Sequence, residues 1–167
     1  MSKSNLNSIR IIAICILSMG VLSIVFGIWG ILVWFDFANA HFPELHYEIS
    51  IPKIVKNYHL GFVTSILEII AGITLLMKKQ IGYYLTFFSC LNFLLFYVIG
   101  FFLKNLENDH QLTIFILKSL FGIMYLVILL LLIMPKIRKE YETTRVGLYR
   151  TLLVNLIFII YGFMFIR

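Results

Sequence analysis

Two ionisable side chains, Glu68 and Lys118, lie inside long apolar runs of this sequence. A charged group at bilayer depth is costly, so such a residue indicates a function or a specific partner. Measured from the starts of their predicted helices, Glu68 lies about 13 Å deep and Lys118 about 9 Å deep, at 1.5 Å per residue. Both helices are expected to run in the same direction, so the lysine can reach the carboxylate.

Three interpretations of this pair stay open. In the first, Glu68 forms an ion pair with Lys118, or a neutral acid hydrogen-bonds Asn92, Ser65 or Ser119, and the contact sets helix register. In the second, Glu68 is a proton- or ion-coupling carboxylate in a transport path. In the third, one member of the pair binds another subunit or a ligand headgroup.

Two amides, Asn92 and Asn155, belong with these groups in an intramembrane polar core. Each lies within an apolar run, and each can hydrogen-bond across helices, which is worth about 0.6 to 2 kcal/mol in a membrane. We expect them to connect helices.

The elements that position these groups follow from composition. The chain has 167 residues, of which 61% are hydrophobic and 13% charged, with a mean hydropathy of +0.97. Soluble domains are roughly 45–50% apolar and 25% charged, and one of this length buries only about 68–70% of its unfolded surface. The sequence therefore predicts an all-α membrane protein whose apolar surface is covered by lipid.

Five segments are long and apolar enough to cross about 30 Å of hydrocarbon, which takes about 20 residues. The predicted spans of this five-transmembrane-helix bundle are residues 11–35, 59–77, 80–103, 112–134 and 147–166. The fifth span starts beside Arg150, whose long side chain can reach the headgroup level. Spans two and three are joined by a very short turn, which predicts a tight antiparallel hairpin.

Small residues at spacings of three and four form a stripe on two of these helices. Such stripes let helix backbones approach closely in a bilayer. The residues predicted to pack are Gly20, Ser23, Gly27 and Gly30 in the first span and Gly61, Ser65 and Gly72 in the second.

The distribution of Lys and Arg predicts that the N-terminus is cytoplasmic and the C-terminus outside, because cytoplasmic loops carry the excess of these residues. The inner side would hold nine: Lys3, Arg10, Lys78, Lys79, Lys136, Arg138, Lys139, Arg145 and Arg150. The outer side would hold four: Lys53, Lys56, Lys104 and Arg167. The expected location is the inner cell membrane, with a basic inner loop at 135–146.

The predicted outer loop, residues 36–58, contains the histidines that come closest to a metal site. His41 and His46 are ligand types that zinc accepts, but no HExxH or other zinc spacing surrounds them. A solvated loop is the favoured interpretation, and no metal or cofactor is predicted.

The sequence contains no GxSxG, P-loop, GxGxxG or CxxC motif, so it predicts no enzyme. Its basic residues occur in short clusters between apolar runs, which argues against a nucleic-acid partner. Two functions are carried forward. The first is a non-enzymatic subunit, assembly partner or protective factor in a membrane complex, with another membrane protein or a homo-oligomer as partner. The alternative is a small oligomeric ion- or solute-coupled transporter or channel that uses Glu68.

Overall fold

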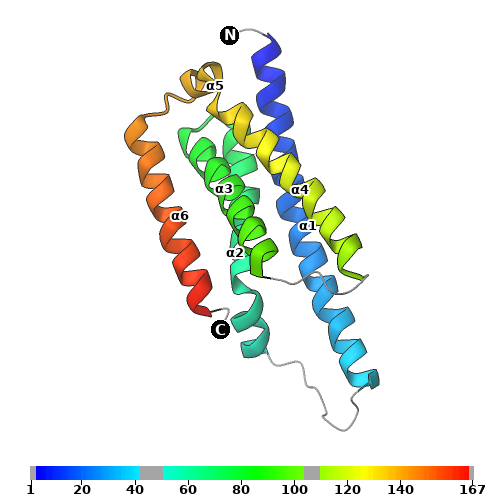
Figure 1. The fold of residues 1–167 in the computed structure, drawn as a ribbon. Coiled ribbons are helices and arrows are strands. Elements are labelled where there is room, and N and C mark those ends of the chain that lie inside the picture. Colours follow the sequence, from blue (N-terminus) through cyan, green and yellow to red (C-terminus); the bar gives the residue numbers. More distant parts are fainter. Residues whose placement is uncertain (1–2, 42–50, 104–109, 166–167) are drawn as a thin grey trace.

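The fold, obtained as a computed structural model, describes residues 3–41, 51–103 and 110–165, and these form helices with no strand among them (Figure 1). In chain order the helices are α1 (Lys3–His41), α2 (Ile51–Leu76), α3 (Gln80–Leu103), α4 (His110–Ile133), α5 (Pro135–Glu140) and α6 (Arg145–Phe165). The all-helical prediction is therefore confirmed for the described residues.

The long helices run alternately in opposite directions, and α3 packs against three of the other long helices (Figure 1). Helix α1 packs along α2, α2 along α3, and α3 also contacts both α4 and α6. The short α5 lies at the same end as the N-terminus and the turn between α2 and α3, while α6 ends at the opposite end (Figure 1). This arrangement brings α1, α3 and α4 around the middle of α2.

Within the described residues, three helices are long and apolar enough to cross a membrane: Asn7–His41, Tyr58–Leu76 and Arg145–Gly162. The described apolar parts of α3 and α4, Gln80–Phe96 and Ser119–Ile133, are shorter. Large apolar side chains are exposed along these helices, including Trp29 at 61% and Ile157 at 59%. Exposed apolar surface of this extent is rare on soluble monomers and marks a lipid or protein contact surface.

The two predicted loops contain more helix than expected. Helix α1 continues to His41 and α2 already starts at Ile51, so the described parts of the predicted 36–58 loop are helical. The predicted basic loop 135–146 contains α5, which starts at Pro135. Proline suits the first turn of a helix, where its missing N–H is not needed, so it ends α4 and begins α5.

The predicted hairpin of α2 and α3 is confirmed, and its turn has a defined hydrogen-bond pattern. Lys78 has a positive φ of 55°. Its N–H donates to the Leu75 carbonyl, and the Lys79 N–H donates to the Thr74 carbonyl. This pair of bonds is a Schellman motif, which satisfies carbonyls at the end of a helix. The motif reverses the chain within three residues and so holds α3 against α2.

The same motif ends α5 and leads into α6. Glu142 has a φ of 49°, and the Thr143 N–H donates to the Arg138 carbonyl. Thr144 then caps α6, because its hydroxyl accepts the Gly147 N–H at 3.0 Å; threonine is a favoured residue at this position. The Thr144 N–H in turn donates to the Tyr84 hydroxyl of α3 at 3.1 Å. Tyr84 therefore fixes where α6 begins.

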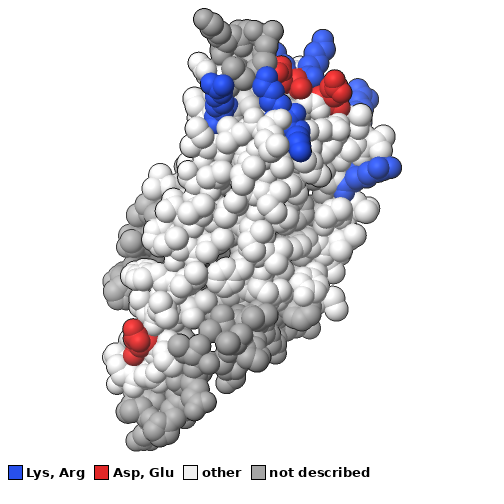
Figure 2. All heavy atoms as spheres, turned by 180° about the vertical axis from the view of Figure 1, so that it is seen from behind, with Lys and Arg blue, Asp and Glu red and all other residues white. Residues whose placement is uncertain are grey.

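Charged side chains gather at the end of the molecule that holds α5 (Figure 2). The described Lys and Arg side chains are Arg10, Lys78, Lys79, Lys136, Arg138, Lys139, Arg145 and Arg150, and all belong to this basic end. Two acids lie among them, and the Glu140 carboxylate forms an ion pair with Lys78, with Oε1 and Nζ 3.7 Å apart.

Tyr141 is buried beside this basic end and donates a hydrogen bond of 3.0 Å to the Leu75 carbonyl. Burial, and to a smaller extent Glu140, raises the pKa of Tyr141 to about 12, so this donor stays neutral at physiological pH.

The hydrophobic core lies in the half of the molecule next to the basic end. It contains Ile12 and Ile16 of α1, Leu75 of α2, Tyr83 of α3 and Leu132 of α4, all at most 2% exposed. Toward the other end α1 and α2 diverge (Figure 1). Glu68 lies where the half of the molecule that contains the core meets the half in which α1 and α2 diverge.

Candidate functional site

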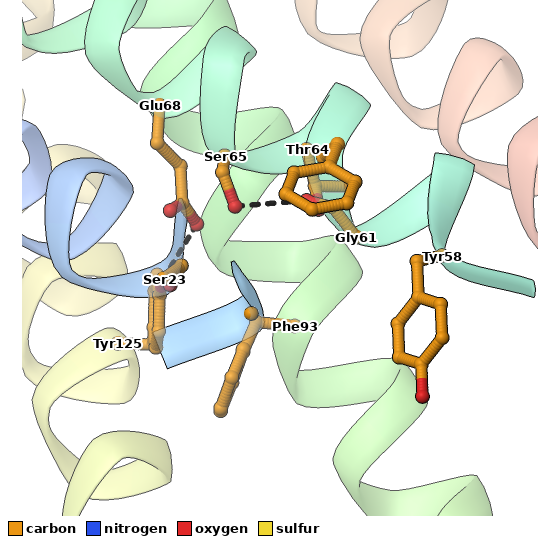
Figure 3. A pocket seen from close by; sticks show the side chains of 10 residues that line it. Ser23, Tyr58, Gly61, Thr64, Ser65, Glu68, Phe93 and Tyr125 are labelled. Atoms are coloured by element: carbon orange, nitrogen blue, oxygen red, sulfur yellow. Dashed lines mark hydrogen bonds between the residues drawn. The ribbon is translucent and has the colours of Figure 1, made fainter. Parts of the chain in front are cut away.

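Glu68 is buried in the middle of α2, with only 5% of its surface exposed. It lies ten residues from Tyr58 and ten from Lys78, which is about 15 Å in each direction at 1.5 Å per residue. The Tyr125 hydroxyl of α4 donates a hydrogen bond of 2.6 Å to Glu68 Oε1 (Figure 3). A short bond from a phenol to a carboxyl oxygen is of the strong, charge-assisted kind when the acceptor is ionised.

A cavity of about 200 Å³ opens beside this carboxyl group. Four helices contribute to it, and its walls are mostly apolar. The lining residues are Ser23 and Gly27 of α1, Tyr58, Gly61, Phe62, Thr64, Ser65 and Glu68 of α2, Phe93 of α3 and Tyr125 of α4. Glu68 lies at one end of this set and Tyr58 at the other (Figure 3), so the cavity extends from the middle of α2 away from the basic end.

Three hydroxyl groups near Glu68 already donate their protons to acceptors within the protein. Ser65 donates to the Gly61 carbonyl at 2.8 Å, and Thr64 donates to the carbonyls of Leu60 and Gly61. Tyr125 donates to Glu68 itself. Around the carboxyl group, these three side chains therefore offer oxygen lone pairs to the cavity rather than protons.

The predicted partners of Glu68 are only partly tested by this geometry. The side chain of Lys118 lies outside the described part of the structure, so the ion pair stays a prediction. Ser65 lies one turn from Glu68 on α2 but bonds its own helix. The described hydrogen bond to the carboxyl group comes from Tyr125, which the sequence interpretation missed. The signal was present, because a tyrosine in the middle of an apolar span needs a partner for its hydroxyl when buried.

The two amides are both buried, at 2% exposure for Asn92 and 1% for Asn155. Asn155 Nδ2 donates to the Phe88 carbonyl at 2.9 Å and so connects α6 to α3, as expected of a helix-linking amide. The Oδ1 atoms of both amides, and the Ser89 hydroxyl, have no hydrogen-bond partner among the described residues. The described hydrogen bond of Asn155 therefore goes to the α3 backbone and not to Glu68, and the predicted core of four polar residues stays a prediction.

The small-residue stripes pack in one half of the molecule and stay open in the other. A Cβ on Gly20 would lie 2.7 Å from the Ser65 carbonyl oxygen, and one on Gly72 would lie 2.6 Å from Leu17 Cβ. A Cβ on Gly27 would meet only the Phe62 ring, at 3.6 Å, and Ser23 is exposed. No described atom lies within 4 Å of a Cβ on Gly30 or Gly61. The packing expected of Gly30 and Gly61 is thus not made by the described chain, because α1 and α2 diverge there.

His41 lies at the end of α1, where its Nδ1 is 3.0 Å from the Phe37 carbonyl oxygen and its ring stacks on Phe37. His46 lies outside the described residues. Among the residues that are described, no three His, Cys, Asp or Glu side chains are grouped so that they could hold a metal ion.

Comparison of the chain with protein-family models, with curated proteins and with solved structures finds no match.

Proposed function

We propose that this chain is a five-span protein of the inner membrane, and that it works as a small cation-coupled carrier in which Glu68 binds the transported cation or a proton. The observation that carries the proposal is a buried carboxyl group, halfway along an apolar span, that lines a cavity instead of being sealed within the core. Ionisable residues at this depth are rare in membrane helices, and they mark ion paths and proton relays.

The charge distribution supports an orientation with the basic end in the cytoplasm. Eight described Lys and Arg side chains accompany only two described acids there, and Asp36 is the described charge near the other end of α1. Under the positive-inside rule, the basic end faces the cytoplasm. The cavity then extends from mid-membrane toward the outer face.

A topology experiment tests the orientation and the fifth span together. Alkaline phosphatase fused after Arg167 should be active, and green fluorescent protein fused there should be dark, because the C-terminus is expected outside. Fusions after Glu142 serve as the control and should give the reverse pattern. If the fusion after Arg167 fluoresces, either α6 does not span the membrane or the proposed orientation is wrong.

The cavity supports exchange chemistry because one carboxyl group can hold either a proton or a cation. When a cation binds the carboxylate, the proton leaves, so the two compete for one site. Among the described residues, the titratable side chains that interact with Glu68 from neighbouring helices are Tyr125 of α4 and Cys90 of α3. Neither is cationic, so neither takes the place of the cation. A path across the bilayer built from five helices calls for a homo-oligomer, in which a second copy completes the wall between α1 and α2.

Proton–cation exchange in liposomes tests the proposed function. Purified protein is reconstituted in vesicles that contain the pH dye pyranine, and an inward gradient of NaCl, KCl or choline chloride is imposed. Cation entry should drive protons out, so the lumen should become alkaline for at least one of the three salts. Glu68→Gln should slow this exchange at least about tenfold, since the amide holds neither a proton nor a cation.

Asp36→Asn is the matched control, because it removes an acid that is exposed at the far end of α1, and its exchange rate should equal that of the unaltered protein. Equal rates for the unaltered protein and Glu68→Gln would contradict the carrier proposal. So would vesicles that behave like protein-free ones.

The open small-residue face around Gly30 and Gly61 favours a second candidate function, that of a subunit or assembly partner in a membrane complex. Small residues left without a neighbour can receive a helix of another membrane protein. If no salt drives exchange, and the protein purified in mild detergent carries a stoichiometric membrane partner, this second function replaces the first.

A further inference from the structure

Aromatic rings surround the cavity from three sides. Tyr58 and Phe62 come from α2, Phe93 from α3 and Tyr125 from α4. Phe93 and Tyr125 stack with ring centroids 4.2 Å apart and an interplanar angle of 21°. Aromatic faces carry negative partial charge and attract cations that approach within about 6 Å. The cavity thus combines a carboxyl group with ring surfaces that favour the same sign of ligand charge.

The charged and hydrogen-bonding groups around Glu68 favour a cation over an anion. No Lys, Arg or His lines it among the described residues. The hydroxyls of Thr64, Ser65 and Tyr125 donate to other acceptors, which leaves their oxygens as acceptors. An anion in this space would meet like charge and lone pairs. A cation, or a ligand that donates hydrogen bonds, would meet complementary groups.

The volume of the cavity suits a small organic molecule. A cavity of about 150 Å³ is enough to hold benzene, and drug-sized ligands fill roughly 300–1,000 Å³. The 200 Å³ beside Glu68 falls between these values. A bare divalent metal ion fits the walls poorly, because such ions take six or more oxygen ligands and these walls are mostly apolar.

We infer that the cavity binds a small organic monocation of the alkylammonium class, with the charge against Glu68 and the carbon groups against Phe93, Phe62 and Tyr125. This inference rests on the proposed function for the location of the site, and it adds the chemical class of the ligand. Binding needs no covalent step. The ligand exchanges its water shell for one carboxylate and several ring faces.

Choline and its neutral isostere, 3,3-dimethylbutan-1-ol, test the inference on the unaltered protein. Radiolabelled choline is measured by equilibrium dialysis against the full chain in mild detergent, and the alcohol is used as a competitor. The two molecules have nearly the same shape, so only the charge differs. Choline should bind saturably, and the alcohol should compete at least about tenfold more weakly, because it lacks the attraction to the carboxylate and the rings.

Two variants assign the binding to this cavity. Glu68→Gln and Phe93→Leu should each weaken choline binding about tenfold. Phe26→Leu is the matched control, because Phe26 is 57% exposed on α1 and does not line the cavity, and its affinity should not change. Absence of saturable choline binding, equal competition by the alcohol, or full affinity in Phe93→Leu would each overturn the inference.

The outcome is distinguishable from that of the carrier proposal. Exchange driven by NaCl or KCl without choline binding would leave the carrier in place and remove the ligand class. Choline binding that depends on Glu68, without exchange in vesicles, would support the ligand class and remove the carrier.

Discussion

Gly82→Ala is expected to prevent stable packing of α3 against α2. A Cβ at this position would lie 2.6 Å from the Thr74 carbonyl carbon and 2.8 Å from Leu75 Cα. Both are backbone atoms held by the Schellman motif, so they cannot move away as a flexible side chain could. Overpacking typically costs about 1–3 kcal/mol. We expect a loss of about 3 kcal/mol or more in the free energy of unfolding, measured by sodium dodecyl sulfate titration in mixed micelles.

Gly30→Ala and Gly61→Ala are the matched controls for this steric effect. No described atom lies within 4 Å of the added methyl group at either position. Alanine is the better helix former by about 0.5–1 kcal/mol, so both controls should be as stable as the unaltered protein or slightly more stable. If Gly82→Ala unfolds at the same detergent fraction as Gly30→Ala, the close contact of α2 and α3 is wrong.

Replacing Glu68 by leucine is expected to abolish cation exchange without destabilising the protein. A charged residue at the centre of a membrane helix costs roughly 2.5–3.5 kcal/mol, whereas leucine is favourable there. The single change leaves the Tyr125 hydroxyl without its acceptor, which costs about 1–3 kcal/mol, so the two effects nearly cancel. The double variant Glu68→Leu/Tyr125→Phe removes both polar groups and should gain about 2 kcal/mol of unfolding free energy.

Tyr125→Phe alone completes the cycle and should lose about 1–2 kcal/mol, because the carboxyl group then lacks its donor. If removal of a polar group stabilises the fold, that group is retained for function and not for stability. If the double variant is instead less stable than the unaltered protein by more than about 1 kcal/mol, Glu68 serves to fix helix register. That outcome would favour the first of the three interpretations of Glu68, in which its contact sets helix register.

Much of the fold is predictable from the sequence because bilayer-length apolar runs are strong signals. The helix at 80–103 has the bounds predicted from its apolar run, and the tight turn after α2 follows from the few residues between two runs. Helix extensions such as 36–41 were not predictable in this way, since polar residues continue a helix without an apolar signal. The short α5 was not predicted either, because its residues are mainly charged and give no apolar signal.

The candidate site shows where sequence reasoning stops. Glu68 stands out in a sequence because a charge inside an apolar run is rare, and Asn155 is recognisable for a similar reason. Tyr125 carries only a general signal, that a buried tyrosine hydroxyl needs a partner, and the identity of that partner depends on a contact between residues 57 positions apart.

The sequence by itself determined the all-helical class, the approximate helices and the buried carboxyl group of the candidate site, because these depend on composition and local periodicity. Only the tertiary structure decided that Tyr125 bonds Glu68, that Gly20 and Gly72 pack while Gly30 and Gly61 do not, and that a cavity opens beside the carboxyl group. Each of these depends on how helices far apart in the sequence pack against one another: α4 against α2 for the hydrogen bond, and α1 against α2 for the glycines.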